Sequence, residues 1–363
     1  MKVRMLGKGE EKVWDAYVLK HTKSTLCHLS GWRRVIEDTY GHKSYYLMAE
    51  SAECNSETKI AGILPLIYIK SLLFGNSLVS MPFLNYGGLL ADDEKTEILL
   101  LEEARRLGRD LRINSIELRQ IQPISWMNGK GAEAALGVEI PEPMTHKVRM
   151  VLNLPESSAM LFDSFKSKLR SQIRKPQKEG LVAVIGGAEL LDEYYHVFAV
   201  NMRDLGSPVH SKKLFENILK EFGVNAKLGI VKYNSNATAA GLVFCFRDTV
   251  EIIWASALRE YNHLSPNMLL YWSLLEYVTG AGYRYFDFGR STPEEGTYRF
   301  KEQWGAKPVW LHWYEVNTEG NAGDMKNVDR KSQLRQKGEK IWQKIPICFA
   351  NMIGPAIRRQ IPL

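Results

Sequence analysis

Two aromatic segments near the end of the chain contain a carboxylate and a cation. Residues 285–290 have the sequence Tyr-Phe-Asp-Phe-Gly-Arg, and residues 300–305 have the sequence Phe-Lys-Glu-Gln-Trp-Gly. Amide formation by amine attack passes through a tetrahedral oxyanion that a preorganised cation stabilises, and the amine must lose a proton to a base. Lys301 is therefore a candidate catalytic cation, and Asp287 is a candidate base.

Both residues also have a structural interpretation. Lys301 could be a surface lysine that lays its stem along the aromatic side chains and keeps its ammonium in water. Asp287 could form an ion pair with Arg284 or Arg290 at the end of a strand. The residue types alone leave both interpretations open.

A predicted helix start provides a candidate donor-binding site. Ser265 is expected to be the N-cap and Pro266 the first helical residue, so the backbone N–H groups of Asn267 and Met268 would point outward unpaired. Helix N-termini of this kind bind phosphates or carbonyl oxygens. An ordinary capped helix is the alternative.

The segment 164–178 is strongly basic and contains no acidic residue. Its basic residues are Lys166, Lys168, Arg170, Arg174, Lys175 and Lys178. A run of this kind is either a solvated helix face or a phosphate-binding surface, which could line a cleft between domains.

Composition limits the class of protein. Hydrophobic residues make up 45% and charged residues 25% of the 363 positions, which is typical of a globular protein and not of a disordered or membrane-embedded one. A chain of this length is expected to form two domains. The net charge of +7 favours anionic partners such as phosphorylated precursors, RNA or a membrane surface.

Cysteine spacing and hydropathy indicate a cytoplasmic location. The four cysteines are far apart and form no C-x-x-C motif, so neither a disulfide framework nor a zinc site is expected. The N-terminal residues contain no apolar segment typical of an export signal.

The tail is basic and then apolar, without a run of about 18 apolar residues that could span a bilayer. Its first part contains Lys326, Arg330, Lys331, Arg335, Lys337, Lys340 and Lys344. Such a tail could lie on the inner face of a membrane or pack back on the protein.

The order of the predicted elements occurs twice. The first copy is a helix over 32–39, strands over 44–49, 60–69 and 79–82, a helix over 93–109 and a strand over 115–119. The second copy is a helix over 190–203, strands over 227–233, 239–246 and 250–255, a helix over 266–279 and a strand over 283–288. This order predicts an α+β fold with a mixed, mainly antiparallel sheet and flanking helices in each copy. The predicted domains are 1–145 and 146–318, followed by the tail over 319–363.

The duplicated unit and two motifs resemble a known family. KLRSQIRKPQKEG and FDFGRSTPEEGTYRFKEQWGAKP are similar to segments of the FemAB-like aminoacyl and acyl transferases, which have two GCN5-related N-acetyltransferase (GNAT) domains in tandem. LSGWRRVIEDTYGH, SMPFLNYGG, NMRDLGSPVHSK and WASALREYNHLSPN resemble a bacterial FemAB-like subgroup associated with exosortase/PEP-CTERM and exopolysaccharide systems. The resemblance covers roughly residues 10–316.

The resemblance implies roles for individual residues. Lys301 aligns with a lysine that neutralises the charge developing during acyl transfer or steadies the donor. Arg170 aligns with a basic residue that contacts the acceptor's phosphates. The other candidate substrate-binding residues are Arg174, Trp32, Arg290, Tyr298 and Trp304.

The resemblance also implies a reaction. An acyl or aminoacyl group would be transferred to an amine-bearing cell-envelope or exopolysaccharide precursor, which is an anionic small molecule or is linked to a lipid. The donor would be acyl-CoA or aminoacyl-tRNA, with no permanently bound cofactor and no metal.

The chain also departs from the family. Neither copy has the R/Q-x-x-G-x-G/A pyrophosphate loop of acetyl-CoA-dependent GNAT proteins, and no long coiled-coil arm is evident. The alternative function is therefore a catalytically degenerate, membrane-peripheral scaffold. RNA binding as the main role has less support, since no recognised RNA-binding motif occurs.

Overall fold

The computed structural model describes residues 1–52, 58–71, 75–127, 142–318 and 333–362. The chain forms two compact units. The first unit comprises Met1–Lys147, Trp310–Val328 and Gln360–Leu363, and the second comprises Val148–Val309 and Asp329–Arg359. Among the described residues, no helix is both long enough and apolar enough to span a membrane.

The first unit is a sheet with the strand order β1-β2-β3-β4-β6-β14, and β5 pairs with β3. The strands are β1 Lys2–Met5, β2 Lys43–Ala52, β3 Thr58–Ile69, β4 Ser77–Val79, β5 Leu90–Ala91, β6 Ser115–Gln120 and β14 His312–Asn317. The helices are α1 Glu11–Lys20, α2 Gly31–Tyr40 and α3 Glu94–Asp110, with short 3-10 helices at Leu26–His28 and Ser125–Met127. Strands β4 and β6 are parallel, whereas β2, β3 and β4 form an antiparallel meander.

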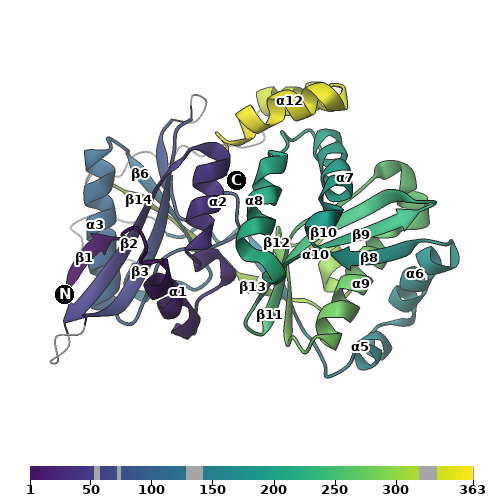
Figure 1. Ribbon diagram of the computed structural model, residues 1–363, viewed down its shortest axis with the longest axis horizontal. Coiled ribbons are helices and arrows are strands. Elements are labelled where there is room, and N and C mark those ends of the chain that lie inside the picture. Colours follow the sequence, from purple (N-terminus) through teal and green to yellow (C-terminus); the bar gives the residue numbers. More distant parts are fainter. Residues whose placement is uncertain (53–57, 72–74, 128–141, 319–332, 363) are drawn as a thin grey trace. The chain divides into compact units, whose positions relative to one another are not determined.

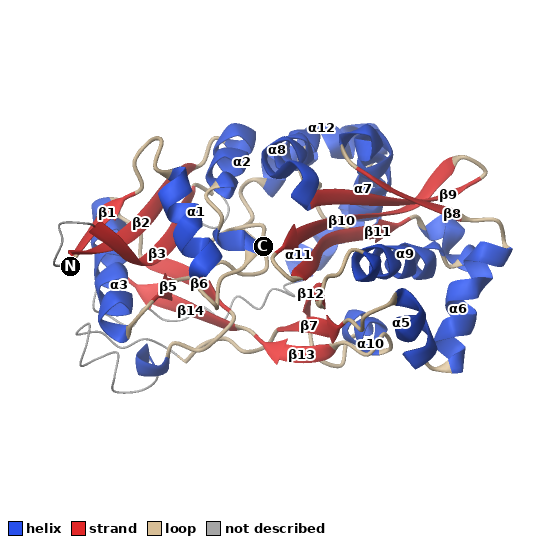
Figure 2. Cartoon of the chain, turned by 60° about the horizontal axis from the view of Figure 1, so that its bottom comes forward, coloured by secondary structure: helices blue, strands red, loops and turns tan. Residues whose placement is uncertain are grey.

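The second unit is a sheet with the strand order β13-β7-β12-β11-β10-β9-β8. The strands are β7 Val148–Asn153, β8 Val182–Gly186, β9 Ala226–Tyr233, β10 Asn236–Phe246, β11 Thr249–Ala257, β12 Tyr285–Ser291 and β13 Lys307–Trp310. The helices are α5 Ser158–Ser164, α6 Ser167–Lys178, α7 Leu191–Asp204, α8 Lys212–Phe222, α9 Pro266–Gly280, α10 Gly296–Glu302, α11 Gln333–Trp342 and α12 Ile347–Arg358. Short 3-10 helices lie at Ala188–Leu190, Gly223–Asn225 and Arg259–Leu264. Figures 1 and 2 show α7 and α8 on one face of the central strands and α9 on the other.

The two units repeat one supersecondary order, as the sequence predicted. In each unit a helix is followed by an antiparallel meander, then a helix, and then a strand parallel to the last strand of the meander. A glycine in the second meander strand supports the packing in both units. A Cβ at Gly62 would lie 2.7 Å from Thr96 Cγ2 of α3, and one at Gly241 would lie 3.4 Å from Leu274 Cδ1 of α9. The missing side chain lets the helix approach the sheet closely.

One strand of the first sheet comes from beyond the predicted first domain. Strand β14 pairs with β6, with Trp313 opposite Arg119, although the sequence predicted one continuous domain over 146–318. Strand β7, which follows β6 in the chain, pairs instead with β12 of the second sheet. Strand β14 is thus supplied to the first sheet by a distant part of the chain, and a boundary based on sequence order does not reveal this.

The predicted tail is not a separate part of the structure. Helix α12 and the described part of α11 belong to the second unit, and Gln360 and the residues after it belong to the first. Lys326, Arg330 and Lys331, which the sequence analysis counted in the basic tail, lie outside the described residues.

Candidate functional site

Strands β11 and β12 of the second unit separate part of the way along their length. Their parallel register begins at Thr249 opposite Tyr285 and ends at Glu251 opposite Asp287. Strand β11 nevertheless continues to Ala257, and β12 continues to Ser291. Along the described residues beyond Glu251, the edge of β11 that faces β12 is therefore outside the ladder between them. Backbone N–H groups on such an edge can bind the carbonyl oxygen of an acyl group.

A bulge in β12 lies where the two strands separate. The register with β7 shifts between Asp287, opposite Val151, and Arg290, opposite Arg149. Gly289 has a φ of 70°, a left-handed conformation that glycine adopts at little cost. The Oδ1 atom of Asp287 accepts a hydrogen bond from the Gly289 backbone N–H at 2.8 Å, so this carboxylate stabilises the bulge.

Asp287 also forms an ion pair that the sequence did not predict. Its side chain is 1% exposed, and its Oδ2 atom lies 3.5 Å from Nη1 of Arg149 on β7. Arg284 and Arg290, the partners that the sequence suggested, are neighbours of Asp287 along the chain, whereas Arg149 is brought to it by the pairing of β7 with β12. One oxygen of Asp287 thus accepts a hydrogen bond within the bulge, and the other pairs with a guanidinium. These contacts are those of a residue that stabilises the fold.

Lys301 is buried beside the same bulge. Its Nζ atom donates hydrogen bonds to the carbonyl oxygens of Gly289 at 3.1 Å and Arg290 at 2.9 Å, and the residue is 8% exposed. Burial lowers the pKa of the Lys301 ammonium to about 8, an effect that the nearby carboxylates of Asp287 and Glu251 oppose and the charge of Arg290 reinforces. The interpretation of Lys301 as a surface lysine is therefore wrong.

This geometry gives Lys301 a defined chemical capacity. An ammonium has three N–H groups, and the two bonds to described residues use two of them. The third can stabilise negative charge that develops near the separation of β11 and β12. A cation held in a buried site needs no reorganisation when that charge appears.

The start of α9 differs from the prediction. Ser265 has a left-handed backbone, with φ 58° and ψ 46°, and its side chain makes no capping hydrogen bond. The Met268 N–H donates to the Ser265 carbonyl oxygen at 3.0 Å, so it is not unpaired as the sequence suggested. The reason is that Ser265 is also the C-cap of the preceding 3-10 helix, Arg259–Leu264, and this fixes its backbone in a conformation unlike that of an ordinary N-cap. Asn267 is half-buried.

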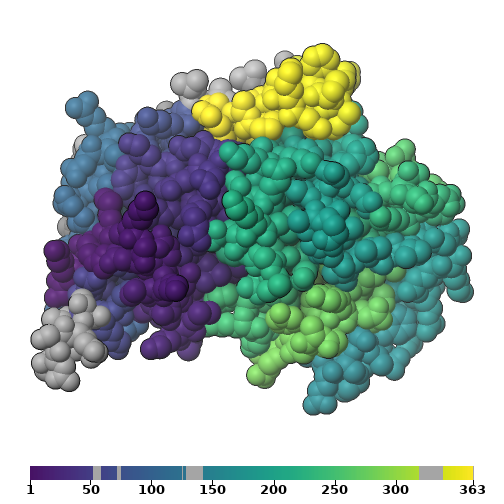
Figure 3. All heavy atoms as spheres, viewed as in Figure 1, coloured from purple at the N-terminus to yellow at the C-terminus, as the bar shows by residue number. Residues whose placement is uncertain are grey.

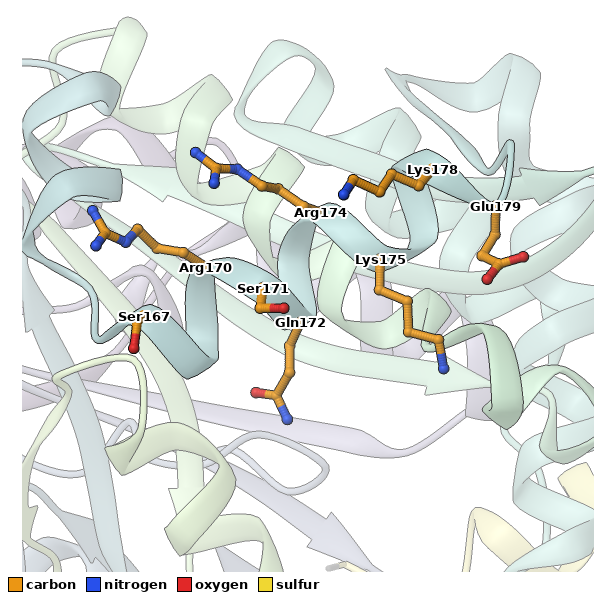
Figure 4. Close-up of a pocket in the computed structure, with 8 residues that line it drawn as sticks. All are labelled: Ser167, Arg170, Ser171, Gln172, Arg174, Lys175, Lys178 and Glu179. Carbon is orange, nitrogen blue, oxygen red and sulfur yellow. The ribbon is translucent and has the colours of Figure 1, made fainter.

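The basic segment predicted from the sequence forms α6, which packs against α9 through buried Leu169 and Ile173. Figure 4 shows Arg170, Arg174 and Lys178 projecting to one side of this helix. They lie beside a depression of about 630 Å³. Its lining residues are Ser167, Arg170, Ser171, Gln172, Arg174, Lys175, Lys178 and Glu179. Three cations spaced four residues apart present one positively charged face, which suits a phosphate-bearing ligand.

The aromatic candidates differ in accessibility. Trp32 is buried in the first unit, where its Nε1 donates to the Leu26 carbonyl oxygen at 3.1 Å. Trp304 is buried in the second unit and packs edge-on against Phe165, with ring centroids 5.6 Å apart. Both are core residues, which corrects their assignment as substrate-binding residues. Tyr298 and Arg290 are half-buried near Lys301 in the chain and stay candidates.

Two residues near the candidate site were missed by the sequence analysis. Arg149 is the ion-pair partner of Asp287, and buried Glu251 lies opposite Asp287 in the parallel register. A polar residue within the apolar strand β11 was the available signal for Glu251. Nothing in the sequence around Arg149 connects it with β12. Among the described residues, no cluster of three or more potential ligands could hold a metal ion.

The corresponding place in the first unit has a different structure. The parallel register of β4 and β6 ends with Val79 opposite Glu117. Here the neighbouring cation is Arg119, which is fully buried and lies 2.7 Å from Glu117 Oε1 through its Nε atom. Its Nη1 donates to the Leu84 carbonyl oxygen at 2.8 Å, and its Nη2 to that of Pro362 at 2.9 Å. The Arg119 guanidinium is therefore occupied by contacts that hold the first unit together. The better candidate site is in the second unit, at Lys301.

Comparison with known proteins identifies the fold. Residues 163–302, which include α6, α9, Asp287 and Lys301, match the family described as "Acetyltransferase (GNAT) domain". Comparison with curated protein sequences gives no match. The GNAT match supports acyltransferase activity.

Solved structures resemble most of the chain at low sequence identity. FemX is 14% identical, with a TM-score of 0.67 over 87% of this chain and 97% of FemX. A tandem GNAT protein from the clavulanic acid biosynthesis pathway is 11% identical, with a TM-score of 0.53 over 88% of this chain and 99% of that one. The C-terminal domain of a putative lysylphosphatidylglycerol synthetase from Agrobacterium fabrum is 11% identical, with a TM-score of 0.54 over 86% of this chain and 92% of that domain. At these identities the likeness concerns the fold, and it confirms the predicted tandem GNAT-like architecture. The predicted link to exosortase/PEP-CTERM systems has no support in these comparisons.

Proposed function

We propose that the protein is an acyltransferase or aminoacyltransferase that forms an amide on an amine-bearing precursor of the cell envelope or of an exopolysaccharide. The observation that carries this proposal is the position of Lys301. Its ammonium is buried at the bulge of β12, beside the point where β11 and β12 separate. The GNAT match includes β11, β12 and α10, the helix that contains Lys301.

In the proposed reaction, a neutral amine of the acceptor attacks the carbonyl carbon of a thioester or ester donor. A C–N bond forms, and the carbonyl oxygen becomes an oxyanion. Backbone N–H groups of β11 beyond Glu251 and the third N–H of Lys301 would stabilise this charge. When the tetrahedral intermediate collapses, the C–S or C–O bond breaks, and the proton released from the amine nitrogen is taken up by the departing thiolate or alkoxide.

Asp287 would act as a positioning residue in this scheme. Its two oxygens are engaged by the Gly289 N–H and by Arg149, and the side chain is 1% exposed. By holding the bulge, the carboxylate fixes the two carbonyl oxygens that orient Lys301. A role of Asp287 as general base is the alternative that mutagenesis can distinguish.

Arg170 and Arg174 would bind phosphates of the acceptor or the donor. Both candidate donors, acyl-CoA and aminoacyl-tRNA, carry phosphates, and neither would be a permanently bound cofactor. Ser265, Asn267 and Met268 would contact the donor at the start of α9. The absence of glycine from 259–266 and the hydrogen bond of the Met268 N–H favour aminoacyl-tRNA over CoA bound in the usual GNAT manner.

The acceptor would be an anionic small molecule or a lipid-linked precursor, encountered in the cytoplasm or at the inner face of the membrane. The resemblance to the C-terminal domain of a putative lysylphosphatidylglycerol synthetase supports a lipid-linked acceptor. The altered start of α9 also supports a second candidate, a catalytically degenerate scaffold at the membrane.

The proposal is tested by transfer assays with the full-length protein. Panels of acyl-CoA thioesters and aminoacyl-tRNAs are combined with amine-bearing envelope precursors, and products are detected by mass spectrometry. With an identified donor, Lys301→Ala is expected to lower the rate by roughly a hundredfold or more, as loss of an oxyanion-stabilising group does. Lys220→Ala removes an exposed lysine of α8 and serves as the control.

Full activity of Lys301→Ala would show that Lys301 does not have the proposed role. If the native protein neither binds nor transfers from any donor in the panels, the scaffold function is favoured. Saturable binding of acyl-CoA or aminoacyl-tRNA, measured by thermal shift, would count against the scaffold.

A further inference from the structure

Helix α12 is fixed to the second unit by one face. Gly354 lies so close to Val209 that an added Cβ would be 3.0 Å from its backbone nitrogen and from its Cγ1. Ala350, one turn earlier, is buried as well. At the C-terminal end of the helix, Nε of Arg358 donates to Nε2 of buried His210 at 3.0 Å. These contacts hold α12 in a defined orientation on the unit.

The opposite face of α12 is apolar and exposed. Phe349 is 54% and Met352 67% exposed, and Ile353 beside them is also exposed. Ile341 of the preceding helix α11 is 65% exposed. We call these four residues the tail face. Figure 3 shows the end of the chain, in yellow, at the surface of the molecule. Single exposed apolar residues are ordinary, but several on adjacent turns of one docked segment mark an interaction site.

The charged residues of the sequence from Lys340 onward have one sign, and the acidic Glu339 immediately precedes them. From residue 340 to the end of the chain there are four basic residues, Lys340, Lys344, Arg358 and Arg359, and no acidic residue. Lys340, Lys344 and Arg359 are exposed. Between Ile347 and Ile357 the helix contains no charged residue at all. An apolar face with a basic border is complementary to a bilayer that contains anionic lipid.

We propose that the tail face is a membrane-docking surface that inserts into the headgroup region of an anionic bilayer. Helix α12 has 12 residues. At a rise of about 1.5 Å per residue it is roughly 18 Å long, too short to cross a hydrocarbon core of about 30 Å. The helix must therefore lie in the plane of the interface, with Phe349 and Met352 directed into the lipid. A second copy of the chain suits this face less well, because it would bring two basic borders together.

This inference rests on exposure and charge and is independent of the proposed transfer chemistry. The test is flotation of the full-length protein with vesicles of phosphatidylglycerol and phosphatidylcholine in equal parts, compared with phosphatidylcholine alone. The native protein is expected to float with the anionic vesicles. Phe349→Gln combined with Met352→Gln should lower the partition coefficient about tenfold or more, since it removes the inserted side chains. Val224→Gln, which replaces an exposed valine outside the tail, is the matched control.

The basic border of the tail face, which consists of the exposed residues Lys340, Lys344 and Arg359, is tested separately. Lys340→Gln and Lys344→Gln should each lower binding to anionic vesicles about fivefold, the ratio that corresponds to about 1 kcal/mol per basic residue near an anionic surface. Lys220→Gln, on α8, should leave binding to anionic vesicles unchanged. Binding by the two lysine variants should approach that of the native protein at high salt, where the attraction is screened.

A label at the tail face reports insertion without removing an apolar side chain. Cys348 is exposed, whereas Cys27 and Cys245 are buried. In a Cys54→Ser background, a polarity-sensitive fluorophore on Cys348 should shift to the blue when anionic vesicles are added. The proposal is overturned if the native protein does not float with anionic vesicles and the fluorescence spectrum does not change when these vesicles are added. It is also overturned if the native protein is a dimer in solution that Phe349→Gln and Met352→Gln convert to monomer while vesicle binding persists.

Discussion

The Nζ atom of Lys301 lies 3.1 Å from the carbonyl oxygen of Gly289, the residue at which β12 takes a left-handed backbone conformation. The same glycine donates its N–H to Asp287 at 2.8 Å. One bulge therefore connects the candidate cation on α10 with the buried carboxylate on β12. Because both bonds depend on the conformation of Gly289, the orientation of Lys301 and the stability of the strand are coupled.

Stability should depend on pH through Lys301. In the unfolded chain its pKa is that of an ordinary lysine, about 10.4, and in the folded protein it is lowered to about 8. Below pH 8 both states are protonated, and the cost of burying the charge is fully present. Between the two pKa values the unfolded state binds more protons, so stability rises with pH, by up to about 3 kcal/mol.

The change is measured with Lys301→Met, which keeps the length of the side chain and removes the titration. The melting temperature of the native protein minus that of Lys301→Met should increase from pH 7.5 to pH 10. A constant difference would show that Lys301 does not titrate in this range. If the cation stabilises the oxyanion, transfer activity should fall as pH rises through about 8, opposite to the trend in stability.

Replacing Arg149 should destabilise the second unit. Arg149→Met leaves the buried Asp287 carboxylate without this ion pair, and we expect a loss of about 1–3 kcal/mol in the free energy of unfolding. Asp287→Asn can still accept the Gly289 N–H, so the double variant should lose less than the sum of the single variants. Thermal unfolding of the four proteins measures this coupling. Additive losses would contradict the ion pair.

The same carboxylate variant distinguishes the two roles of Asp287. If Asp287 is a positioning residue, Asp287→Asn should lower transfer activity less than Lys301→Ala does. If Asp287 is the general base, Asp287→Asn should lower transfer activity at least as much, in a protein that still melts cooperatively.

The repeated order of helices and strands could be predicted because apolar periodicity and strand propensity act locally. The helix predicted over 32–39 is found as α2, Gly31–Tyr40, and the strand predicted over 283–288 is found as β12, Tyr285–Ser291. The partner of β6 could not be predicted, because β14 lies in a distant part of the chain and local patterns do not specify such pairing. For the same reason Arg149 was missed.

The type of a residue also did not show whether it belongs to the hydrophobic core or to the candidate functional site. Trp32 and Trp304 were predicted to bind substrate from a resemblance of the motifs around them, yet each is buried with its ring packed in a core. Lys301 was open to both a surface and a site interpretation, and its burial follows from the packing of α10 on β12, which no short segment encodes. The capping prediction at Ser265 failed because the preceding 3-10 helix sets its backbone.

Arg119 should be important for the stability of the first unit. Its buried guanidinium binds the carbonyl oxygens of Leu84 and Pro362, and it lies over the ring of Trp313 at 4.5 Å. Arg119→Met removes these hydrogen bonds and leaves Glu117 without its cation, although the Pro362 oxygen keeps the Phe83 N–H as a donor. We expect a loss of about 3–5 kcal/mol in the free energy of unfolding.

Arg106→Met is the matched control for Arg119, because its ion pairs with Glu103 and Asp110 are exposed on α3 and should contribute little. Differential scanning calorimetry would show the change. Hydrogen exchange at the end of the chain should also become faster in Arg119→Met, since Pro362 loses a bonding partner. Equal melting of the two variants would show that the Arg119 contacts add no stability.

Gly354 should determine whether α12 stays docked. A side chain at this position would meet the backbone of Val209, which cannot move as the end of a flexible side chain can, so Gly354→Leu should detach the helix from the second unit. Gly338→Leu, on α11, is the control because no atom of the described residues outside its own helix turn lies within 4 Å of an added Cβ there, and leucine favours a helix over glycine. Hydrogen exchange measured by mass spectrometry should show protection of residues 347–358 lost in Gly354→Leu and kept in Gly338→Leu. Retained protection in Gly354→Leu would mean that the contact with Val209 does not hold α12 in place.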